Sequence, residues 1–436
     1  MKKWNGVLVL LLVGAQGGII GDDWPGFRGS TGNGVSAETG LPSEWSLQRN
    51  LAWTLDLPGR GNSSPAIVGD RLYLTTKEDD HTLRVLAVDP KSGRILWNVA
   101  VGNGEMPTQG PRSLYAHRHN AATPSPAADP KRVYAYFGNG LMVCLDRDGK
   151  ERWRIDLVKR YGAYNVRFGM AASPRVWDDR LYHICLHKGP SYVLALNAQS
   201  GSVAWKRDRK FAAEYDGPDA YSSPVIFTTP KGPRLLVAGS DHVNAYDLSN
   251  GEQVWYSGGL TIDSHYGRVL VSPAVADDVV VVCSANPPDA VGLALALRTD
   301  GTGDVTDSHR LWRFTSGTPD APTPVCYRDR VYMVRDDGVA TILELRTGQL
   351  IWQDRLGNGT FRAATVAGDG KVYFLSKEGE CVVMQAGSKG RILARNQLPG
   401  TFFATPAICE GSLFLRGHGK LYSISSRKTA RTTSGN

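Results

Sequence analysis

One nine-residue pattern, Asp-x-x-[Ser/Thr]-Gly-x-x-x-Trp, recurs along this chain of 436 residues. Its first full copy runs from Asp89 to Trp97. Three further segments keep this spacing, namely Asn197 to Trp205, Asp247 to Trp255 and Glu344 to Trp352, whereas Asp146 to Trp153 is one residue shorter. Repeats of roughly 40–60 residues that contain several short strands are typical of a propeller or a repeat array.

A second repeated element, Ser-Pro or Thr-Pro, stands ahead of each copy, and a strand rich in apolar residues follows it. In most repeats this strand begins seven residues after the proline, as at Pro65 and Leu72. The other prolines of the series are Pro126, Pro174, Pro224, Pro273, Pro324 and Pro406. One more repeat has Thr365 in the place of the proline, so eight inner strands are predicted.

The two ends of the repeat series complete one another. The last repeat ends after Ile424 without a Trp strand, while Leu51 to Leu55 is a Trp strand with no repeat before it. We therefore predict an all-β, eight-bladed β-propeller with four-stranded antiparallel blades, closed by an N-terminal strand that pairs with the C-terminal blade. Ala394 stands where blade seven should have its tryptophan, which predicts a weakly packed seam. Seven tryptophans are expected to dock neighbouring blades: Trp53, Trp97, Trp153, Trp205, Trp255, Trp312 and Trp352.

The N-terminus has the features of an export signal. Lys2 and Lys3 precede an apolar run from Val7 to Val13, which is shorter than the ~20 residues of a membrane span. We expect a signal peptide over residues 1–21, cleaved near Ala15 or Gly21, a propeller over 22–424 and a disordered tail over 425–436. The mature protein is then periplasmic or extracellular, without a transmembrane span, and we expect a monomer.

Charge and cysteine content narrow the possible functions. The formal net charge is +8, but the Lys and Arg residues are scattered, which argues against nucleic-acid binding. The six cysteines are irregularly spaced, and Cys144, Cys185 and Cys283 lie in apolar strand runs. Buried free thiols are the favoured interpretation, and one or two disulfide bridges are the alternative.

The repeats resemble those of the pyrroloquinoline-quinone (PQQ)-type eight-bladed propellers. The resemblance covers about residues 22 to 424, and the stretch Asp23 to Gly29 resembles one found in exported bacterial proteins with these repeats. That family contains quinoprotein alcohol dehydrogenases, which bind PQQ and calcium, and non-enzymatic propellers such as BamB. The resemblance therefore implies the fold but leaves the function open.

Candidate catalytic and metal sites are few. The resemblance implies an adjacent Cys-Cys pair for a dehydrogenase, and this chain has none. The segment from Asp300 to Asp304 lacks the full pattern of a calcium loop and is read as an enlarged hairpin turn. His117 and His119 could bind a metal from one side of a strand, but a solvated loop is favoured. We predict no catalytic residue, no metal site and no cofactor; PQQ and calcium enter only under the alternative of an oxidoreductase with a reduced active site.

The loops that join strand four of one blade to strand one of the next share one face of a propeller, and here they carry cationic and aromatic residues. Long propeller loops are often polar with scattered aromatics, so a plain solvated surface is the simplest interpretation. The alternative is a cationic, aromatic-lined binding mouth at the ring axis. On that hypothesis the protein is a non-catalytic scaffold that binds a protein partner or a cell-envelope ligand. The candidate residues are Arg60, His117, His119, Arg167, Phe168, His265, Tyr266, Arg268, Arg362 and Phe403.

Overall fold

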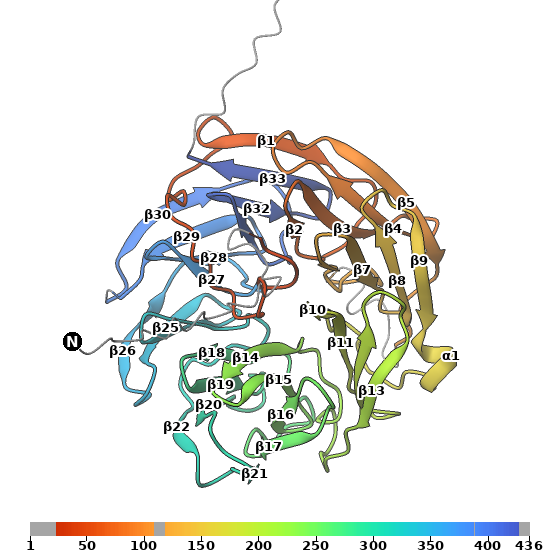
Figure 1. The fold of residues 1–436 in the computed structure, drawn as a ribbon. Coiled ribbons are helices and arrows are strands. Elements are labelled where there is room, and N and C mark those ends of the chain that lie inside the picture. Colours follow the sequence, from red (N-terminus) through yellow and green to blue (C-terminus); the bar gives the residue numbers. More distant parts are fainter. Residues whose placement is uncertain (1–22, 109–117, 388, 427–436) are drawn as a thin grey trace, which may run out of the picture.

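The computed structural model describes residues 23–108, 118–387 and 389–426, which form eight sheets arranged around a central axis (Figure 1). The predicted all-β, eight-bladed propeller is confirmed. The predicted signal peptide lies outside the described residues, as does most of the predicted tail. The last strand ends at Ser425, one residue beyond the expected end of the propeller. In the part of the chain that is described, no helix is long and apolar enough to cross a membrane.

Blades one to four follow one another along the chain, each with its short inner strand first. Their strands are β2 (Ala66–Val68), β3 (Arg71–Lys77), β4 (Thr82–Val88) and β5 (Ile95–Asn103); β6 (Ala127–Ala128), β7 (Arg132–Tyr136), β8 (Leu141–Asp146) and β9 (Glu151–Asp156); β10 (Arg175–Trp177), β11 (Arg180–Cys185), β12 (Tyr192–Asn197) and β13 (Val203–Asp208); and β14 (Val225–Thr229), β15 (Gly232–Gly239), β16 (His242–Asp247) and β17 (Gln253–Ser257). A five-residue helix, α1 (Leu157–Tyr161), follows blade two.

Blades five to eight repeat this plan. Their strands are β18 (Ala274–Ala276), β19 (Val279–Cys283), β20 (Ala294–Arg298) and β22 (Arg310–Phe314); β23 (Val325–Tyr327), β24 (Arg330–Val334), β25 (Val339–Glu344) and β26 (Leu350–Arg355); β27 (Val366–Gly368), β28 (Lys371–Leu375), β29 (Glu380–Gln385) and β30 (Ile392–Gln397); and β31 (Ala407–Cys409), β32 (Ser412–Arg416), β33 (Lys420–Ser425) and β1 (Leu51–Asp56).

The ring closes between the two ends of the chain. Strand β1 pairs antiparallel with β33, with Trp53 opposite Ser423, and the two strands lie side by side in Figure 1. The predicted closure by an N-terminal strand is therefore confirmed. Because β1 becomes the outer strand of blade eight, blades eight and one are held together by the continuous chain.

The repeated motif forms a turn onto which the preceding blade docks. In the first copy, the Asp89 carboxylate accepts hydrogen bonds from the main-chain N–H groups of Lys91 (2.8 Å) and Ser92 (3.2 Å). Gly93 has φ +74°, and a Cβ added there would lie 2.6 Å from the Trp53 indole. The Trp53 indole N–H donates to the carbonyl of Pro90 at 3.0 Å. Glycine is therefore required for its backbone conformation and for the close approach of the indole.

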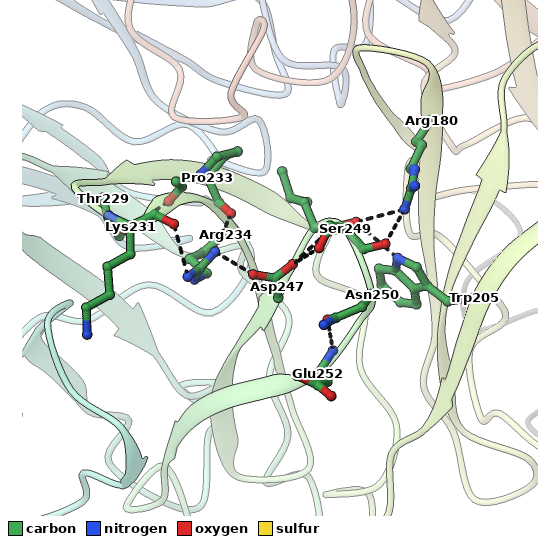
Figure 2. Close-up of polar contacts among 12 residues, drawn as sticks. Arg180, Trp205, Thr229, Lys231, Pro233, Arg234, Asp247, Ser249, Asn250 and Glu252 are labelled. Atoms are coloured by element: carbon green, nitrogen blue, oxygen red, sulfur yellow. Dashed lines mark hydrogen bonds and ion pairs between the residues drawn. The ribbon is translucent and has the colours of Figure 1, made fainter.

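The same docking recurs around the ring. The indole N–H donates to the next blade's turn in five further pairs: Trp97 to Arg147, Trp153 to Ala198, Trp205 to Leu248, Trp255 to Thr299 and Trp312 to Leu345. Figure 2 shows the junction of blades three and four, where Trp205 and Arg180 reach the turn that holds Asp247 and Ser249. Trp352 lies against Gly390 in the same way, since a Cβ added to Gly390 would be 2.1 Å from its indole.

The structure tests two further predictions from the sequence, one on the segment from Asp300 to Asp304 and one on the six cysteines. The segment from Asp300 to Asp304 lies in the connection between β20 and β22, and its last two residues form β21 (Gly303–Asp304), which adds to the outer edge of blade four beside β17. It is an enlarged hairpin turn, as predicted. All six cysteines are buried and none is part of a disulfide bond in the described part of the chain, which confirms the buried thiols and shows the disulfide alternative to be wrong.

An N-terminal arm, residues 23–50, crosses the ring on the side opposite the loops that join strand four to strand one. Its groups form hydrogen bonds with all eight blades, through Ile67, Ala128, Arg175, Ile226, Val275, Pro324, Ala367 and Gly411 in blade order. In several blades a carbonyl group of the arm accepts a hydrogen bond from the main-chain N–H of an inner strand. For example, the Ile226 N–H donates to the Thr31 carbonyl at 2.8 Å. The arm thus caps the free inner edges, which would otherwise expose unpaired donors.

The arm also corrects the expectation for blade seven. Ala394 does occupy the tryptophan position of that blade, opposite Val383. Trp45 of the arm fills the place: it is 4% exposed, and its ring centroid is 6.5 Å from that of Tyr373. Its main-chain N–H donates to the side-chain oxygen of Asn396 at 2.8 Å, which holds this part of the arm on blade seven. The predicted weak seam is therefore wrong, because a tryptophan distant in sequence packs there.

We expect Trp45→Ala to lower the free energy of unfolding by about 3–5 kcal/mol, the usual cost of removing a buried aromatic side chain. Leu47→Ala, in the same arm but 48% exposed, is the matched control and should change stability by less than ~1 kcal/mol. Chemical denaturation of both variants measures this difference. Equal stabilities would show that Trp45 does not fill the seam.

A buried histidine lies where blades two and three meet. His183 on β11 is fully buried, and its ring centroid is 4.1 Å from that of Tyr136. Neither ring nitrogen has a hydrogen-bond partner among the described residues. Burial lowers the pKa of His183 to about 3, so the side chain is neutral in the folded protein at neutral pH.

This burial predicts a loss of stability in acid. The unfolded chain protonates His183 below about pH 6.5, but the folded chain does not until about pH 3. Stability is therefore complete above pH 6.5 and falls as the pH is lowered, by about 2 kcal/mol between pH 7 and pH 5 for one such histidine. His183→Phe should remove that part of the pH dependence in denaturant titrations. An unchanged slope in His183→Phe would contradict this assignment.

Candidate functional site

A pocket of about 270 Å³ occupies the axis of the ring. Its mouth is formed by the loops that join strand four of one blade to strand one of the next, and Phe27 of the N-terminal arm lines it from the opposite end. The arm lies across that end, so the loop face provides the mouth. The lining residues are Phe27, Asn62, Ser64, Arg118, His119, Thr123, Ser125, Phe168, Ala171, Ser173, Tyr221, Ser223, Arg268, Leu270, Ser272, Asp320, Ala321, Thr323, Arg362, Ala364, Phe403 and Thr405.

Cations and aromatic rings are stacked on one side of the mouth. The Arg268 guanidinium lies 5.1 Å from the ring centroid of Phe168 and 6.0 Å from that of Tyr221. Arg167 lies 5.4 Å from the Phe168 centroid and 5.2 Å from that of Tyr266. These contacts hold the guanidinium groups in place and leave aromatic faces beside them.

A single carboxylate anchors several of these cations. Asp216, whose side chain is 3% exposed, pairs with Arg167 at 2.9 Å, Lys188 at 3.5 Å and Arg268 at 3.8 Å. The neighbouring Asp219 accepts the main-chain N–H of Arg167 at 2.8 Å, and burial raises its pKa. Three cations beside the two carboxyl groups of Asp216 and Asp219 leave this side of the mouth with an excess of positive charge.

The other side of the mouth holds Arg362 between two acids. Arg362 forms ion pairs with Asp336 and, at 3.7 Å, with Asp320. Burial raises the pKa of Asp336 to about 6, and the Arg362 charge opposes that rise. Asp320 also accepts the main-chain N–H of Asn286 at 3.2 Å, so its carboxylate is already engaged.

The candidate residues from the sequence fall into three groups in the structure. His119, Phe168, Arg268, Arg362 and Phe403 line the pocket. Arg167, His265 and Tyr266 lie beside it, with His265 packed on Tyr215 at 4.1 Å between ring centroids. Arg60 is exposed and outside the lining, where its carbonyl accepts from Asn120 at 2.9 Å, and His117 lies outside the described residues. Burial lowers the pKa of His119 to about 4, so it is neutral in the pocket.

Sequence reasoning missed a ring of hydroxyl groups around the axis. The residue before each inner strand's proline position lines the pocket: Ser64, Ser125, Ser173, Ser223, Ser272, Thr323, Ala364 and Thr405. Each hydroxyl accepts the main-chain N–H of the equivalent residue in the preceding blade, over seven bonds of 2.8–3.2 Å. The repeated Ser-Pro was the available signal, because equivalent positions of a propeller meet at its axis.

Comparison with known proteins establishes the family. A family model described as "Outer membrane protein assembly factor BamB" matches residues 84–222 and 189–432. This chain belongs to that family of PQQ-type, BamB-like propellers.

Similar proteins carry different functions. The chain is 24% identical to a tetrathionate hydrolase of Acidithiobacillus ferrooxidans, over 81% of this chain and 70% of that protein. It is also 24% identical to the outer membrane protein assembly factor BamB of Yersinia pestis, over 73% of this chain and 74% of that protein. The structure of a quinohemoprotein alcohol dehydrogenase from Comamonas testosteroni superposes with a TM-score of 0.65 at 13% identity, covering 94% of this chain and 82% of that one. This last similarity shows the fold alone.

The pocket does not fit PQQ held with calcium. Calcium needs several oxygen ligands, and Asp320, the one acidic residue in the lining, is paired with Arg362. Across the described residues, no group of three or more His, Cys, Asp or Glu side chains is placed to hold a metal ion.

We therefore expect calcium to make no difference to PQQ retention. The purified chain, incubated with PQQ in calcium or in EGTA and passed through gel filtration, should show the same cofactor absorbance in both conditions and no dye reduction with alcohols. A stoichiometric, calcium-dependent complex that reduces dye would reverse this conclusion in favour of an oxidoreductase.

Proposed function

We propose that this chain is an exported, non-catalytic propeller scaffold that captures a protein partner or a cell-envelope ligand through its loop face. The observation that carries the proposal is the axial pocket, whose mouth combines Arg118, Arg268 and Arg362 with Phe168 and Phe403. Binding groups placed on loops and held by a rigid scaffold are the usual arrangement of a recognition surface.

Exposed aromatic residues extend this surface beyond the pocket. Tyr215 is 51% exposed and Tyr266 is 41% exposed, and His265 packs on Tyr215. Exposed tyrosines next to cations are typical of the centres of protein interfaces, because they supply a large contact area with little loss of side-chain freedom. Membership of the BamB-like family is consistent with a binding role, since the relative from Yersinia pestis is named as an assembly factor.

The competing proposal is an enzyme acting on an anionic substrate. It is favoured by the cationic mouth and by the relative named tetrathionate hydrolase, whose substrate is a sulfur oxyanion. Incubation of the purified chain with tetrathionate, with its loss followed by ion chromatography, separates the two. Turnover that is lost in Arg268→Gln would favour the enzyme over the scaffold.

A loop-face variant tests capture directly. Tyr215→Ala, His265→Ala and Tyr266→Ala in one chain should abolish recovery of the partner from a cross-linked envelope fraction, because the three side chains are exposed in the structure and removing them leaves the core intact. The melting temperature should stay within about 2 °C of wild type.

The matched control removes exposed apolar side chains elsewhere. Leu47→Ala with Leu350→Ala, in the arm and on β26, should capture the partner as wild type does. Arg167 and Arg362 are left intact because each pairs with a largely buried carboxylate, Asp216 or Asp336, so that removing it would confuse stability with binding. Equal capture by all three proteins would refute the proposal.

A further inference from the structure

The hydroxyl ring around the axis has a capacity for hydrogen bonding that the protein itself does not use. Each of its seven hydroxyl oxygens accepts a main-chain N–H from the neighbouring blade, which leaves the hydroxyl hydrogen to be donated elsewhere. None of the seven hydroxyls donates a hydrogen bond to another group in the described part of the chain. Ser64 and Ser125, for example, act only as acceptors.

The seven residues that carry these hydroxyls are buried and line the pocket. They are only 1–4% exposed: Ser64, Ser125, Ser173, Ser223, Ser272, Thr323 and Thr405. All seven line the pocket, and a buried hydroxyl without an acceptor is costly, so such groups are almost always paired with protein, water or ligand. The pocket therefore offers a circle of hydroxyl donors whose hydrogens are left for water or a ligand to accept.

The charge around the ring favours an acceptor that is negative. Arg118, Arg268 and Arg362 line the pocket, against a single lining carboxylate, Asp320. Two further arginines, Arg28 and Arg175, are buried near the inner strands and donate to backbone carbonyls, such as those of Pro324 and Pro224. Neither arginine forms an ion pair among the described residues. Buried cations paired only with neutral carbonyls give the axis a positive potential.

We propose that the axial pocket binds an organic oxyanion, a carboxylate, sulfonate, sulfate or phosphate group on an apolar body, with the ring hydroxyls and mouth arginines donating to its oxygens. Phe168, Tyr221 and Phe403 contact the apolar part. This inference rests on the proposed function and names the chemical class that the loop face captures. A neutral sugar fits less well, because its many hydroxyl donors need acceptors and the one lining carboxylate is already paired.

The first experiment compares two probes of the same shape and different charge. Benzenesulfonate and benzenesulfonamide are titrated into the full chain by calorimetry, with inorganic sulfate as a third probe. We expect benzenesulfonate to bind at least about tenfold more tightly than the sulfonamide, since hydrogen bonds to a charged acceptor are the stronger ones. Equal binding of the two, or no binding of benzenesulfonate, overturns the proposal.

The gap in the ring supplies a gain-of-function variant. Ala364 is the one ring position without a hydroxyl, so the main-chain N–H of Thr323 has no hydroxyl from blade seven to donate to. In Ala364→Ser the new oxygen would accept that N–H and direct an eighth donor into the pocket. We expect benzenesulfonate to bind about fivefold more tightly, with no loss of melting temperature. Weaker binding in a stably folded Ala364→Ser variant contradicts the ring as the donor set.

A loss-of-charge pair completes the test. Arg118→Gln at the mouth should weaken benzenesulfonate binding at least about fivefold, whereas Arg313→Gln, exposed on the outer strand β22, lowers the net charge equally and should have no effect. Equal weakening in both variants would assign the binding to net charge alone and refute a pocket site.

The source of the oxyanion is decided by competition. If excess benzenesulfonate elutes the captured envelope partner, the partner carries the anionic group. If the partner stays bound, the pocket takes a free small molecule, and the oxyanion class stands in both cases.

The proposed partner function and the proposed oxyanion site can be refuted separately. Charge-selective binding together with full capture by the Tyr215, His265 and Tyr266 variant refutes the partner function alone, and loss of capture without charge-selective binding refutes the oxyanion site alone.

Discussion

The contact on which this structure depends is an indole lying on a glycine. Each blade is a small sheet that cannot bury its faces alone, so the ring exists only if neighbouring blades pack closely. The tryptophan of one blade covers the glycine of the next turn, and its N–H reaches a carbonyl of the same turn, as Trp53 does at Gly93 and Pro90. Side-chain packing and a specific hydrogen bond are thus combined in one repeated contact, which fixes the angle between blades and with it the size of the axial pocket.

Closure of the ring adds a second constraint that the repeats cannot supply. A ring of similar blades has inner edges with free donors and a seam where the chain ends meet. Here β1 completes blade eight, and the N-terminal arm bonds to every blade and supplies Trp45 where Ala394 leaves a space. The arm also brings Phe27 to the axis, which links closure to the shape of the pocket. One segment therefore stabilises the ring and limits access to the axial pocket to the loop face.

The parts of this molecule that could be predicted from the sequence are those specified by the repeated motifs. The spacing of Asp, Gly and Trp predicts eight blades, the closing strand and the turn chemistry, because each contact joins equivalent positions of adjacent repeats. The role of Trp45 could not be predicted in this way, since Trp45 belongs to no repeat and its partner Tyr373 is more than three hundred residues away. The loop residues Phe168, Arg268 and Arg362 were found as a face, but the pairing of Arg167 and Arg268 with Asp216 depends on loop conformations that no local pattern encodes.

The hydroxyl ring shows how a repeat can carry structure and recognition together. The Ser of each Ser-Pro stabilises the junction of two blades by accepting a main-chain N–H, so its presence is explained without any ligand. Because each of these oxygens already accepts from the neighbouring blade, its hydroxyl hydrogen is left for a ligand in the pocket that the residues line. A structural hydrogen bond repeated around a circle thereby produces a convergent set of donors, and the arginines on the loops add the charge that selects which acceptor enters.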